Sequence, residues 1–464
     1  MDVDGELAGL LDEVGVPIDV GVRIEGEDPV LASPVPVGEA AAVALAACAA
    51  TAAQLWAERT GRLQDVRVGV RAAAASLVSF LLQRLDPPAP AIATRIFSPV
   101  TALYETADGP WIHLHGGFPH LAEGTLRLLG CRADADRTTI ASAVRRRPAA
   151  ELEDQLAAAG LCGAVVRTGD EWARLPQARA IAPLGRVTIS KLAGGEPRPA
   201  GDHDRPLGGL RVLDLTRLLA GPTAGRTLAE HGAEVLLVSS PRLGNVAPFV
   251  LDTSHGKRSA HLDLDEPADA DRLRALAAGA DVVVQSYRAG ALAGRGFGPA
   301  DLAVGHPGVV YVTVNCYGDV GPWSPRPGWE QMAESVTGLA TAQGGDGPPE
   351  LIPAAPCDYI TGYLAALGAL AALRRREREG GSYLVQASLC QTGTWLEQLP
   401  RADHERATGL SGWTDLAVES ATAHGRLLHL GPVADMSVTP PRWNRPPPPL
   451  GADPAMWQPT PGAH

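Results

Sequence analysis

The sequence is short of positive charge. Its 464 residues carry 40 Lys and Arg side chains against 52 Asp and Glu, which gives a formal net charge of −12 and a pI near 5.5. Binding to nucleic acid in general needs a broad basic face, so this balance argues against a nucleic-acid partner. It does not exclude an anionic ligand, because local arginine clusters and helix N-termini bind anions inside acidic proteins.

Three further absences bear on where the protein works. No run approaches the ~18 uninterrupted apolar residues of a membrane span, so we expect no transmembrane helix and no membrane partner. The acidic segment from Met1 to Glu6 lacks the basic start of a signal peptide. The cysteines show no CxxC spacing, which favours reduced thiols in a cytoplasmic protein and argues against zinc. These cysteines are Cys48, Cys131, Cys162, Cys316, Cys357 and Cys390.

Histidines offer no metal site either. His113, His115 and His120 form a loose cluster, but no acidic residue stands at ligand-like spacing from them. We therefore expect no bound metal and treat these histidines as core or surface residues.

The composition allows a large folded protein of two or three domains. Apolar residues make up 45% of the chain and the mean hydropathy is zero, so sizeable cores can be buried. Segments rich in Pro, Gly and charge predict linkers at Asp86–Pro90 and Gly194–Gly208. The tail after Thr439 is dominated by proline, which predicts an extended segment that wraps a surface.

Residues 210–314 alternate between strand-like and helix-like segments. This alternation is typical of an open α/β sheet with helices on both faces. The predicted strands are 210–215, 234–238, 281–285 and 309–314, and the predicted helices are 220–231 and 267–278. Ligands in such sheets bind beyond the carboxyl ends of the strands. Those ends are 216–222, 239–245, 286–295 and 315–328.

Residues 96–190 predict a smaller α+β domain. A hairpin is expected around Asp108-Gly109, a strong turn signal between two apolar runs. The predicted elements are strands at 100–104, 111–114 and 163–166 and helices at 121–129 and 149–159.

The chain also contains an internal repeat. The block from Gly38 to Leu77 aligns with the block from Cys357 to Leu396 at a constant offset of 319. A period this long indicates a duplicated domain rather than a solenoid. The alignment places Glu39 on Asp358, so each copy of a helix-turn-strand unit begins with a carboxylate. Glu39 is either a relic of a degenerate first copy or a second carboxylate that faces a partner's site.

Asp358 starts an apolar helix of small residues that is predicted to run to about Leu373. An acid at a helix start can be a plain N-cap that accepts a hydrogen bond from a free amide. It can also be a reactive group held at the mouth of a packed scaffold. The local pattern leaves both roles open.

Short motifs follow one another from Pro206 to Ala366. They are Pro206–Thr216, Ala220-Gly221-Pro222, Leu228–Val235, Gly256–Ser259, Leu262–Leu264, Ala280–Val284, Gly290–Leu292, Gly296–Gly298, Gly338-Leu339 and Asp358…Gly362…Ala365-Ala366. In this order they resemble the class III CoA-transferases, the CaiB/BaiF-type family that includes formyl-CoA transferase. Tyr104, residues 108–111 and residues 163–166 resemble the smaller domain of the same family.

The resemblance implies a Rossmann-like large domain and a smaller α+β domain, in an altered order. In an ordinary member the smaller domain follows the catalytic aspartate, whereas here it precedes the Rossmann-like block. The chain therefore resembles the C-terminal part of one family unit joined to the N-terminal part of a second. The expected domains are 1–90 (a partial large-domain segment that repeats 357–396), 91–195 (the smaller domain), 206–400 (the Rossmann-like CoA-binding domain) and 401–464 (completion of the large domain).

The resemblance also implies an enzyme that moves CoA between carboxylic acids. Asp358 falls on the family's nucleophile, which attacks an acyl-CoA and forms a mixed anhydride and then an aspartyl-CoA thioester. Glu330 resembles a glutamate that assists in some members, although a helix N-terminal acid is an equal alternative. The implied substrates are an acyl-CoA and a carboxylic acid acceptor, and the implied assembly is a homodimer. Members of the family form interlocked dimers; the reordered domains of this chain either mimic that interlocking within one chain or still need a second copy. The implied CoA contacts are Arg217, Leu219, Ala220, Lys257, Arg258, Tyr287 and Arg295; for each arginine the alternative is a solvated surface charge.

Several departures keep other functions open. The family's acids after the second strand are replaced by Ser239 and Asn245. The racemase branch places a histidine where this chain has Trp329, and a two-base proton exchange needs a second acid or base there. The alternatives are therefore a 2-methylacyl-CoA racemase or epimerase, disfavoured by Trp329, and a non-catalytic CoA-binding protein, disfavoured by Asp358.

Overall fold

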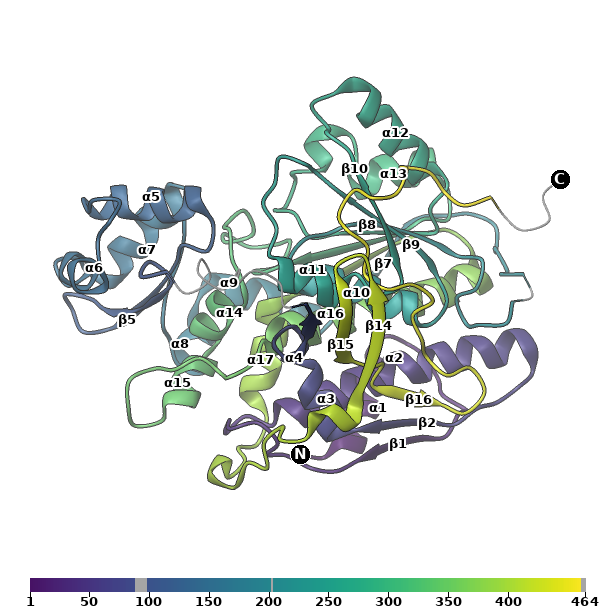
Figure 1. The fold of residues 1–464 in the computed structure, drawn as a ribbon, viewed down its shortest axis with the longest axis horizontal. Coiled ribbons are helices and arrows are strands. Elements are labelled where there is room, and N and C mark those ends of the chain that lie inside the picture. Colours follow the sequence, from purple (N-terminus) through teal and green to yellow (C-terminus); the bar gives the residue numbers. More distant parts are fainter. Residues whose placement is uncertain (88–97, 202, 460–464) are drawn as a thin grey trace.

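A seven-stranded sheet forms the centre of the molecule. The structure, a computed structural model, describes residues 1–87, 98–201 and 203–459 (Figure 1). The strand order is β10-β9-β8-β11-β12-β13-β7, with six parallel strands and an antiparallel β7 at one edge. The strands are β7 (Thr188–Ala193), β8 (Arg211–Leu215), β9 (Glu234–Ser239), β10 (Lys257–His261), β11 (Val282–Gln285), β12 (Val310–Asn315) and β13 (Ser382–Ser388). The predicted α/β sheet is confirmed.

Continuous apolar runs explain why these strands lie inside. Strand β11 reads Val-Val-Val-Gln and is buried at every position. Val282 pairs with Val212 of β8 on one side and with Val310 of β12 on the other. A parallel strand that is covered on both faces needs apolar, β-branched residues throughout, so it shows no polar alternation.

Helices cover both faces of this sheet (Figure 1). Val282 and Val284 belong to a core shared with α2 (Val37–Thr60), α10 (Ala220–Glu230) and α16 (Pro356–Glu379). Val283 faces the opposite way, into a core shared with α12 (Pro267–Ala278) and α13 (Pro299–Gly305). The alternation of adjacent valines between two cores follows from the two-residue period of a strand.

Small residues bring α10 and α16 close together. A Cβ atom on Gly362 of α16 would lie 2.6 Å from the carbonyl oxygen of Ala220 and 2.6 Å from Cβ of Thr223. Only glycine lets the backbones approach this closely. The contact fixes the start of α10, and therefore the loop before it, against the helix that carries Asp358.

The element boundaries agree with the internal repeat that the sequence predicts. Helix α2 spans 37–60 and α16 spans 356–379, so both ends obey the offset of 319 that the sequence indicates. The following helices, α3 (Val70–Ser76) and α17 (Leu389–Gln398), also begin at matching positions. The strands differ in partners, because β13 lies in the large sheet whereas β2 (Val66–Gly69) pairs with β1 (Val22–Glu25) and β16 (Ala434–Met436). The first copy thus has a small sheet of its own.

The smaller domain forms a separate lobe at the left of Figure 1. Its antiparallel sheet has the order β4-β5-β6, and three helices pack on it around the core residues Ile112, Leu114 and Leu152. The elements are β4 (Ala102–Glu105), β5 (Trp111–His115), α5 (Pro119–Leu129), α6 (Arg137–Val144), α7 (Ala149–Ala158) and β6 (Cys162–Val165). Residues 188–193, which fall within the expected bounds of the smaller domain (91–195), form β7 (Thr188–Ala193), and this strand pairs instead with β13 of the large sheet.

The C-terminal region binds to several earlier segments. Strands β14 (Ala417–Thr422) and β15 (Gly425–Leu430) form a hairpin that pairs with β3 (Arg84–Asp86), and β16 pairs with β2. The described tail after Thr439 contains no helix or strand, as its prolines predict. Residues 88–90 of the first expected linker lie outside the described residues, and the second linker has no helix or strand in its described part.

The remaining helices are short, except for α1. The short elements are α4 (Ser79–Leu82), α8 (Gly169–Arg174), α9 (Pro176–Ile181), α11 (Ala247–Thr253), α14 (Glu330–Thr337) and α15 (Leu339–Gly344), and α1 spans Val3–Glu13. The two long helices, α2 and α16, are unusually apolar. By length and composition each could cross a membrane, but their most apolar windows are 100% and 94% buried within the fold. Helices that are apolar on every side are typical of a protein core.

Candidate active site

Asp358 lies in the first turn of α16, and it is not the cap of that helix. The N-cap is Ala355, whose side chain makes no capping hydrogen bond. Asp358 is partly exposed, whereas its neighbours Cys357 and Tyr359 are buried. The N-cap role considered for Asp358 is therefore wrong, and its carboxylate stays available for other partners.

Glu330 holds the backbone of this turn. It is the first residue of α14 and is only 3% exposed. Its carboxylate accepts the N–H of Cys357 at 2.9 Å and also the N–H of Asp358. These two amides are among the free donors at the N-terminus of α16. A glutamate from another helix therefore caps α16, which brings Glu330 and Asp358 together as the resemblance implies.

Glu334 completes a cluster of three carboxyl groups. It follows Glu330 by one turn of α14, is 1% exposed, and accepts the N–H of Ile352 at 2.7 Å. Burial raises the pKa of Glu334 to about 8 and the pKa of Asp358 to about 7. Burial, and then the negative charges of Asp358 and Glu334, raise the pKa of Glu330 well above its usual range.

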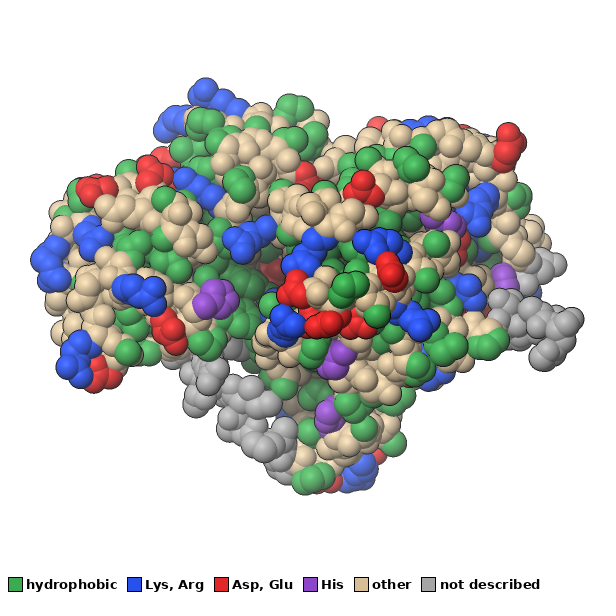
Figure 2. Space-filling model, turned by 90° about the horizontal axis from the view of Figure 1, so that it is seen from above, with side chains coloured by type: hydrophobic (Ala, Val, Ile, Leu, Met, Phe, Trp, Pro, Cys, Tyr) green, Lys and Arg blue, Asp and Glu red, His purple; other side chains and the backbone are tan. Residues whose placement is uncertain are grey.

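A cavity of about 710 Å³ opens between the large sheet and the smaller domain. Figure 2 shows a hollow beside the lobe on the left, with Lys or Arg side chains at its edge. The lining includes Arg217, Arg242, Arg288 and Arg326, and the described lining residues include no Asp or Glu. The cavity is therefore suited to an anionic ligand. It lies at the carboxyl ends of β8, β9, β11 and β12, where the alternation of strands and helices places a ligand.

The loop after β8 forms one wall of this cavity. Arg217 donates its backbone N–H to Ser286 Oγ at 3.1 Å, and its guanidinium donates to the carbonyl of Gly244. The guanidinium carbon also lies 5.6 Å from the centre of the Phe118 ring. Leu218 has φ = 72°, a left-handed conformation that is rare for a residue other than glycine. Burial lowers the pKa of Arg217.

Leu219 and Ala220 lie behind that loop and do not line the cavity. Both side chains are buried, and Leu219 caps α10. They support the loop through the packing of Ala220 against Gly362.

Tyr287 joins this cavity to a second one of about 270 Å³, because it lines both. The second cavity is mainly apolar, with Leu215, Leu262 and Leu273 in its wall. Arg295 also lines it, donating to Asp265 at 2.9 Å. The structure thus places Arg217 in the wall of the first cavity, Arg295 in the wall of the second and Tyr287 in both.

Lys257 and Arg258 lie outside both cavities. Lys257 is fully buried and donates to Asp214 and to the carbonyl of Pro222, each at 2.7 Å. An ammonium group placed away from water needs such partners, and the full burial of Lys257 keeps it out of reach of a ligand in either cavity. The implied contact between Lys257 and CoA is therefore not supported.

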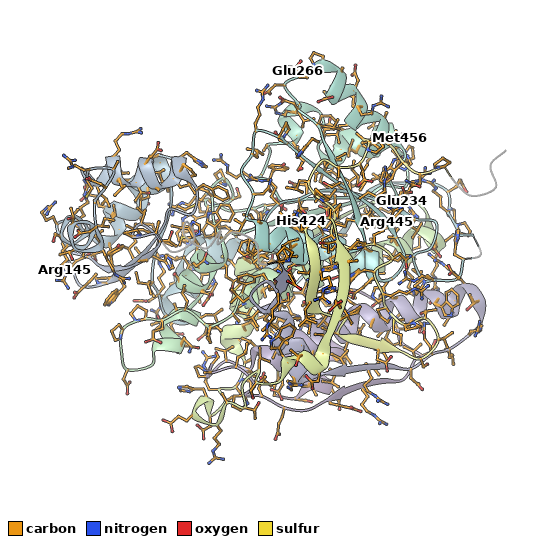
Figure 3. All side chains as sticks on the ribbon, viewed as in Figure 1. Arg145, Glu234, Glu266, His424, Arg445 and Met456 are labelled. Carbon is orange, nitrogen blue, oxygen red and sulfur yellow. The ribbon has the colours of Figure 1, made fainter. Side chains whose placement is uncertain are left out.

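Arg258 is held by the C-terminal tail. Its guanidinium donates to the carbonyl of Met456 at 2.7 Å and lies 3.5 Å from Glu234 and 3.4 Å from Asp453. Figure 3 labels Glu234 and Met456, both of which Arg258 contacts. The positive charge of Arg258 serves to fix the tail, so the expected ligand contact is corrected here as well.

An aromatic wall from both domains closes the end of the first cavity near Asp358. Trp329 stacks on His115 at 5.4 Å and on Phe118 at 5.7 Å between ring centres. Its indole N–H donates to Sγ of Cys162 at 3.1 Å. Burial lowers the pKa of His115 to about 4, so this wall is uncharged at neutral pH.

Asp358 does not itself line the cavity. The nearest lining residues are Cys316, Gly328 and Trp329. Burial, and in addition the negative charge of Asp358, raise the pKa of Cys316, and Trp329 directly precedes Glu330 in the chain. Asp358 therefore lies behind this part of the wall.

The positions of the two missing acids are occupied by neutral side chains. Ser239 bonds to Nδ1 of His261 at 3.1 Å and lines the second cavity. Asn245 lines the first cavity. The neutral Asn245 leaves the described wall of the first cavity without a carboxylate, whereas the second cavity has Asp263 and Asp265 in its wall.

Sequence reasoning missed Glu334, Arg242 and Phe118. The signal for Glu334 was its spacing of four residues from Glu330, which places both on one face of a helix. Arg242 follows β9, at a strand end where ligands were expected. Phe118 comes from the smaller domain, and only the three-dimensional packing brings it to Arg217.

Glu39 occupies the position in α2 that Asp358 occupies in α16, but in a closed setting. Its N–H donates to Asp28 at 2.7 Å, and its carboxylate lies 3.1 Å from the amino group of Met1. It lines neither of the two cavities described above. Asp28 thus takes, in the first copy, the place that Glu330 takes in the second. Among the described residues no group of three or more His, Cys, Asp or Glu is arranged to hold a metal ion.

The fold is an α/β sheet with an arginine-lined cavity at the carboxyl ends of its strands and a carboxylate near the start of a buried helix. The sequence profile of CoA-transferase family III matches residues 15–188 and 207–412, and this chain belongs to that family.

Named relatives agree with this assignment. The chain is 39% identical over 314 residues to an acyl-CoA transferase of Gibberella moniliformis, covering 62% of this chain and 55% of that protein. It is 32% identical over 342 residues to acetyl-coenzyme A transferase nodX of Hypoxylon pulicicidum, covering 68% and 56%. It is 33% identical over 256 residues to succinyl-CoA:glutarate CoA-transferase of Mus musculus, covering 51% and 57%.

Among solved structures, Rv3272 of Mycobacterium tuberculosis is 34% identical, with a TM-score of 0.40 and coverage of 43% of this chain and 57% of that one. The chain spans a little over half the length of the curated relatives named above.

Proposed function

We propose that the protein transfers CoA between carboxylic acids, with Asp358 as the nucleophile. The single observation that carries the proposal is the setting of Asp358, a partly exposed carboxylate in a buried helix start next to an arginine-lined cavity. The names of its relatives as CoA-transferases support the same reaction.

The cavities fit a CoA thioester. The apolar second cavity suits an adenine ring, with Tyr287 at its border. Arg217, Arg242 and Arg288 then meet the phosphates, because guanidinium groups pair well with phosphate oxygens. The pantetheine arm runs through the first cavity towards Trp329, which leaves the thioester near the segment that holds Asp358.

The chemistry needs a carboxylate that is both ionised and poorly solvated. A carboxyl oxygen of Asp358 attacks the thioester carbon, the C–S bond breaks, and CoA leaves as a thiolate. The thiolate then attacks the Asp358 carbonyl of the mixed anhydride, which releases the first acid and forms an aspartyl-CoA thioester. The acceptor carboxylate attacks the carbonyl carbon of this thioester, which forms a second mixed anhydride and frees the thiolate again. The thiolate then attacks the acceptor's carbonyl carbon, which yields the new acyl-CoA and restores the Asp358 carboxylate.

The pKa of Asp358 suits this role. Burial raises it to about 7, so near neutral pH a large share of the group is ionised yet has lost much of its hydration. A desolvated anion is the more reactive nucleophile, provided that it is fixed close to its target.

Two other functions fit the geometry less well. A racemase needs a second acid or base at position 329, and the indole of Trp329 is held by stacking and by Cys162. A protein that only binds CoA has no need of a carboxylate whose burial costs free energy.

Trapping the intermediate tests the proposal. The protein is incubated with a panel of acyl-CoA thioesters and then treated with hydroxylamine or borohydride, and peptides are analysed by mass spectrometry. We expect a modification on Asp358 in the wild-type protein and none in Asp358→Asn. If CoA binds but no acyl-CoA yields an adduct, the transferase function is rejected; exchange of the substrate's α-proton with deuterium would support the epimerase instead.

We also propose a cytoplasmic location and a homodimer. The cysteines show no CxxC spacing and five of the six thiols are buried, which supports the cytoplasmic location. Light scattering after size-exclusion chromatography tests the second: a mass of one 48.2 kDa chain would contradict the dimer.

A further inference from the structure

Two glutamates one turn apart on α14 form hydrogen bonds to the backbone segment that ends at Asp358. Glu330 accepts the N–H groups of Cys357 and Asp358, and Glu334 accepts the N–H of Ile352 at 2.7 Å. The backbone from 352 to 358 is therefore held at both ends by the side chains of α14. Both carboxyl groups are almost completely buried, so their geometry is set by the packed core.

The two carboxyl groups lie one turn apart on α14 and are both buried beside Asp358. Two buried carboxylates that face each other in a medium of low polarity cannot both be ionised without a large cost. One proton shared between them removes that cost, because a protonated carboxyl group can donate a hydrogen bond to its neighbour.

The groups that face this pair do not supply a compensating positive charge. Asp358 is the charged neighbour that acts on both glutamates. Burial raises the pKa of Cys357 and of Cys316 well above the usual range and lowers that of His113 on β5 to about 3, so all three are neutral. Among the other elements packed against α14, α8 carries the exposed Asp170, Glu171 and Arg174, and α15 has no titratable residue. The titratable residues of α17 are Cys390 and Glu397, and β6 carries Cys162. Arg167, just after β6, donates its backbone N–H to Ser335 of α14, but its guanidinium pairs with Glu153 at 2.6 Å.

We propose that Glu334 is a positioning residue of this site: it shares one proton with Glu330, and the singly protonated pair holds segment 352–358 and limits the negative charge beside Asp358. The inference rests on the proposed use of Asp358 as nucleophile. When the shared proton is lost, two negative charges face each other behind Asp358. Their repulsion weakens the hydrogen bonds to segment 352–358 and displaces Asp358.

The matched variants separate this role from simple capping. Glu334→Gln keeps an oxygen that can accept the Ile352 N–H, and its amide can donate to Glu330, but it has no proton to lose. Glu334→Asp keeps a titratable carboxyl group. Glu419→Gln is the control, since Glu419 lies exposed on β14, far along the chain from α14.

The rate of adduct formation on Asp358 is measured against pH. In the wild type we expect a rise as Asp358 ionises and then a fall by about tenfold or more between pH 7.5 and 9.5 as the pair loses its proton. Glu334→Gln should keep the acid limb and lose the alkaline fall, while Glu334→Asp and Glu419→Gln should retain it. An alkaline fall that is unchanged in Glu334→Gln overturns the proposal, because a purely structural cap predicts that result.

Infrared spectroscopy reads the shared proton without any turnover. The pKa of Asp358 is about 7, so the comparison is made in the Asp358→Asn background, which removes that carboxyl group. The carbonyl band of a protonated carboxyl group should be present in Asp358→Asn at neutral pH and should be lost in the double variant Asp358→Asn, Glu334→Gln. Equal bands in these two variants refute the shared proton. If the band behaves as expected but no variant forms an adduct, the transferase function fails and the proton pair stands.

Discussion

Replacing Gly362 by alanine tests how closely α16 must approach α10. The added Cβ would meet the carbonyl oxygen of Ala220 and Cβ of Thr223, each at 2.6 Å. Carbon atoms in a protein normally stay ~3.5–4 Å apart, so the two helices must separate by several tenths of an ångström. The carbonyl belongs to the backbone and cannot rotate away.

Two effects of opposite sign set the magnitude. A helix gains about 1 kcal/mol when an interior glycine becomes alanine. Overpacking a core costs about 1–3 kcal/mol, and a rigid backbone contact lies at the high end of that range. We expect Gly362→Ala to lower the free energy of unfolding by roughly 1–2 kcal/mol net. Because Ala220 follows the loop of Arg217 and Leu218, the same shift should weaken CoA binding.

Unfolding in urea and titration calorimetry with CoA measure the two effects. Gly305→Ala is the control, because this glycine is also helical and nothing lies within 4 Å of the added Cβ. Gly368→Ala tests a different kind of contact, since its added Cβ would meet a side-chain methyl group of Val385 at 2.4 Å and not a backbone carbonyl. If Gly362→Ala is as stable as the wild type and binds CoA equally well, the close approach of the helices does not support the loop.

Three further predictions concern charges. Arg217→Ala should raise the Kd for CoA about tenfold or more through loss of a charge-assisted contact, whereas Arg426→Ala on the exposed hairpin should not change it in calorimetry. Lys257→Met should lower the free energy of unfolding by about 3–5 kcal/mol because it leaves Asp214 buried and unpaired; a CoA affinity lost without loss of stability would restore Lys257 to the binding site. The folded protein raises the pKa of Asp358 above its unfolded value, so it costs stability increasingly as pH rises from about 4 to about 7. Asp358→Asn should therefore match the wild type in thermal melts at pH 4 and be more stable at pH 8, and the opposite order would refute the raised pKa.

Patterns of local period predicted the large sheet well. The strands at 234–238 and 309–314 could be read from the sequence because buried parallel strands are continuous apolar runs. The boundaries of α2 and α16 followed the repeat for a similar reason, since both copies bury the same helix. The helix at Arg137–Val144 was missed, because its Arg-Thr-Thr start has weak helix propensity and its stability comes from packing against β4 and α5.

Predictions about single charged residues were less reliable. The sequence shows that Lys257 follows a turn near a strand, but it does not show that Asp214, 43 positions earlier, lies beside it. Arg258 depends even more on distant contacts, since its partners come from the tail at Asp453 and Met456. Long-range pairing decides whether an arginine meets a ligand or a neighbour, and no local pattern encodes it.

The C-terminal tail covers an edge strand of the large sheet that could otherwise pair with other chains. Strand β10 is the outer strand of the large sheet, and an uncovered outer strand is a template on which other chains can add strands. The tail occupies it: the N–H of Asp453 donates to the carbonyl of Ser259 at 2.7 Å, and the Asp453 carboxylate accepts the N–H of Ser259 at 2.9 Å. Prolines on either side prevent the tail from becoming a strand that could recruit a further one. The last described residues thus act as a built-in guard against aggregation through the sheet.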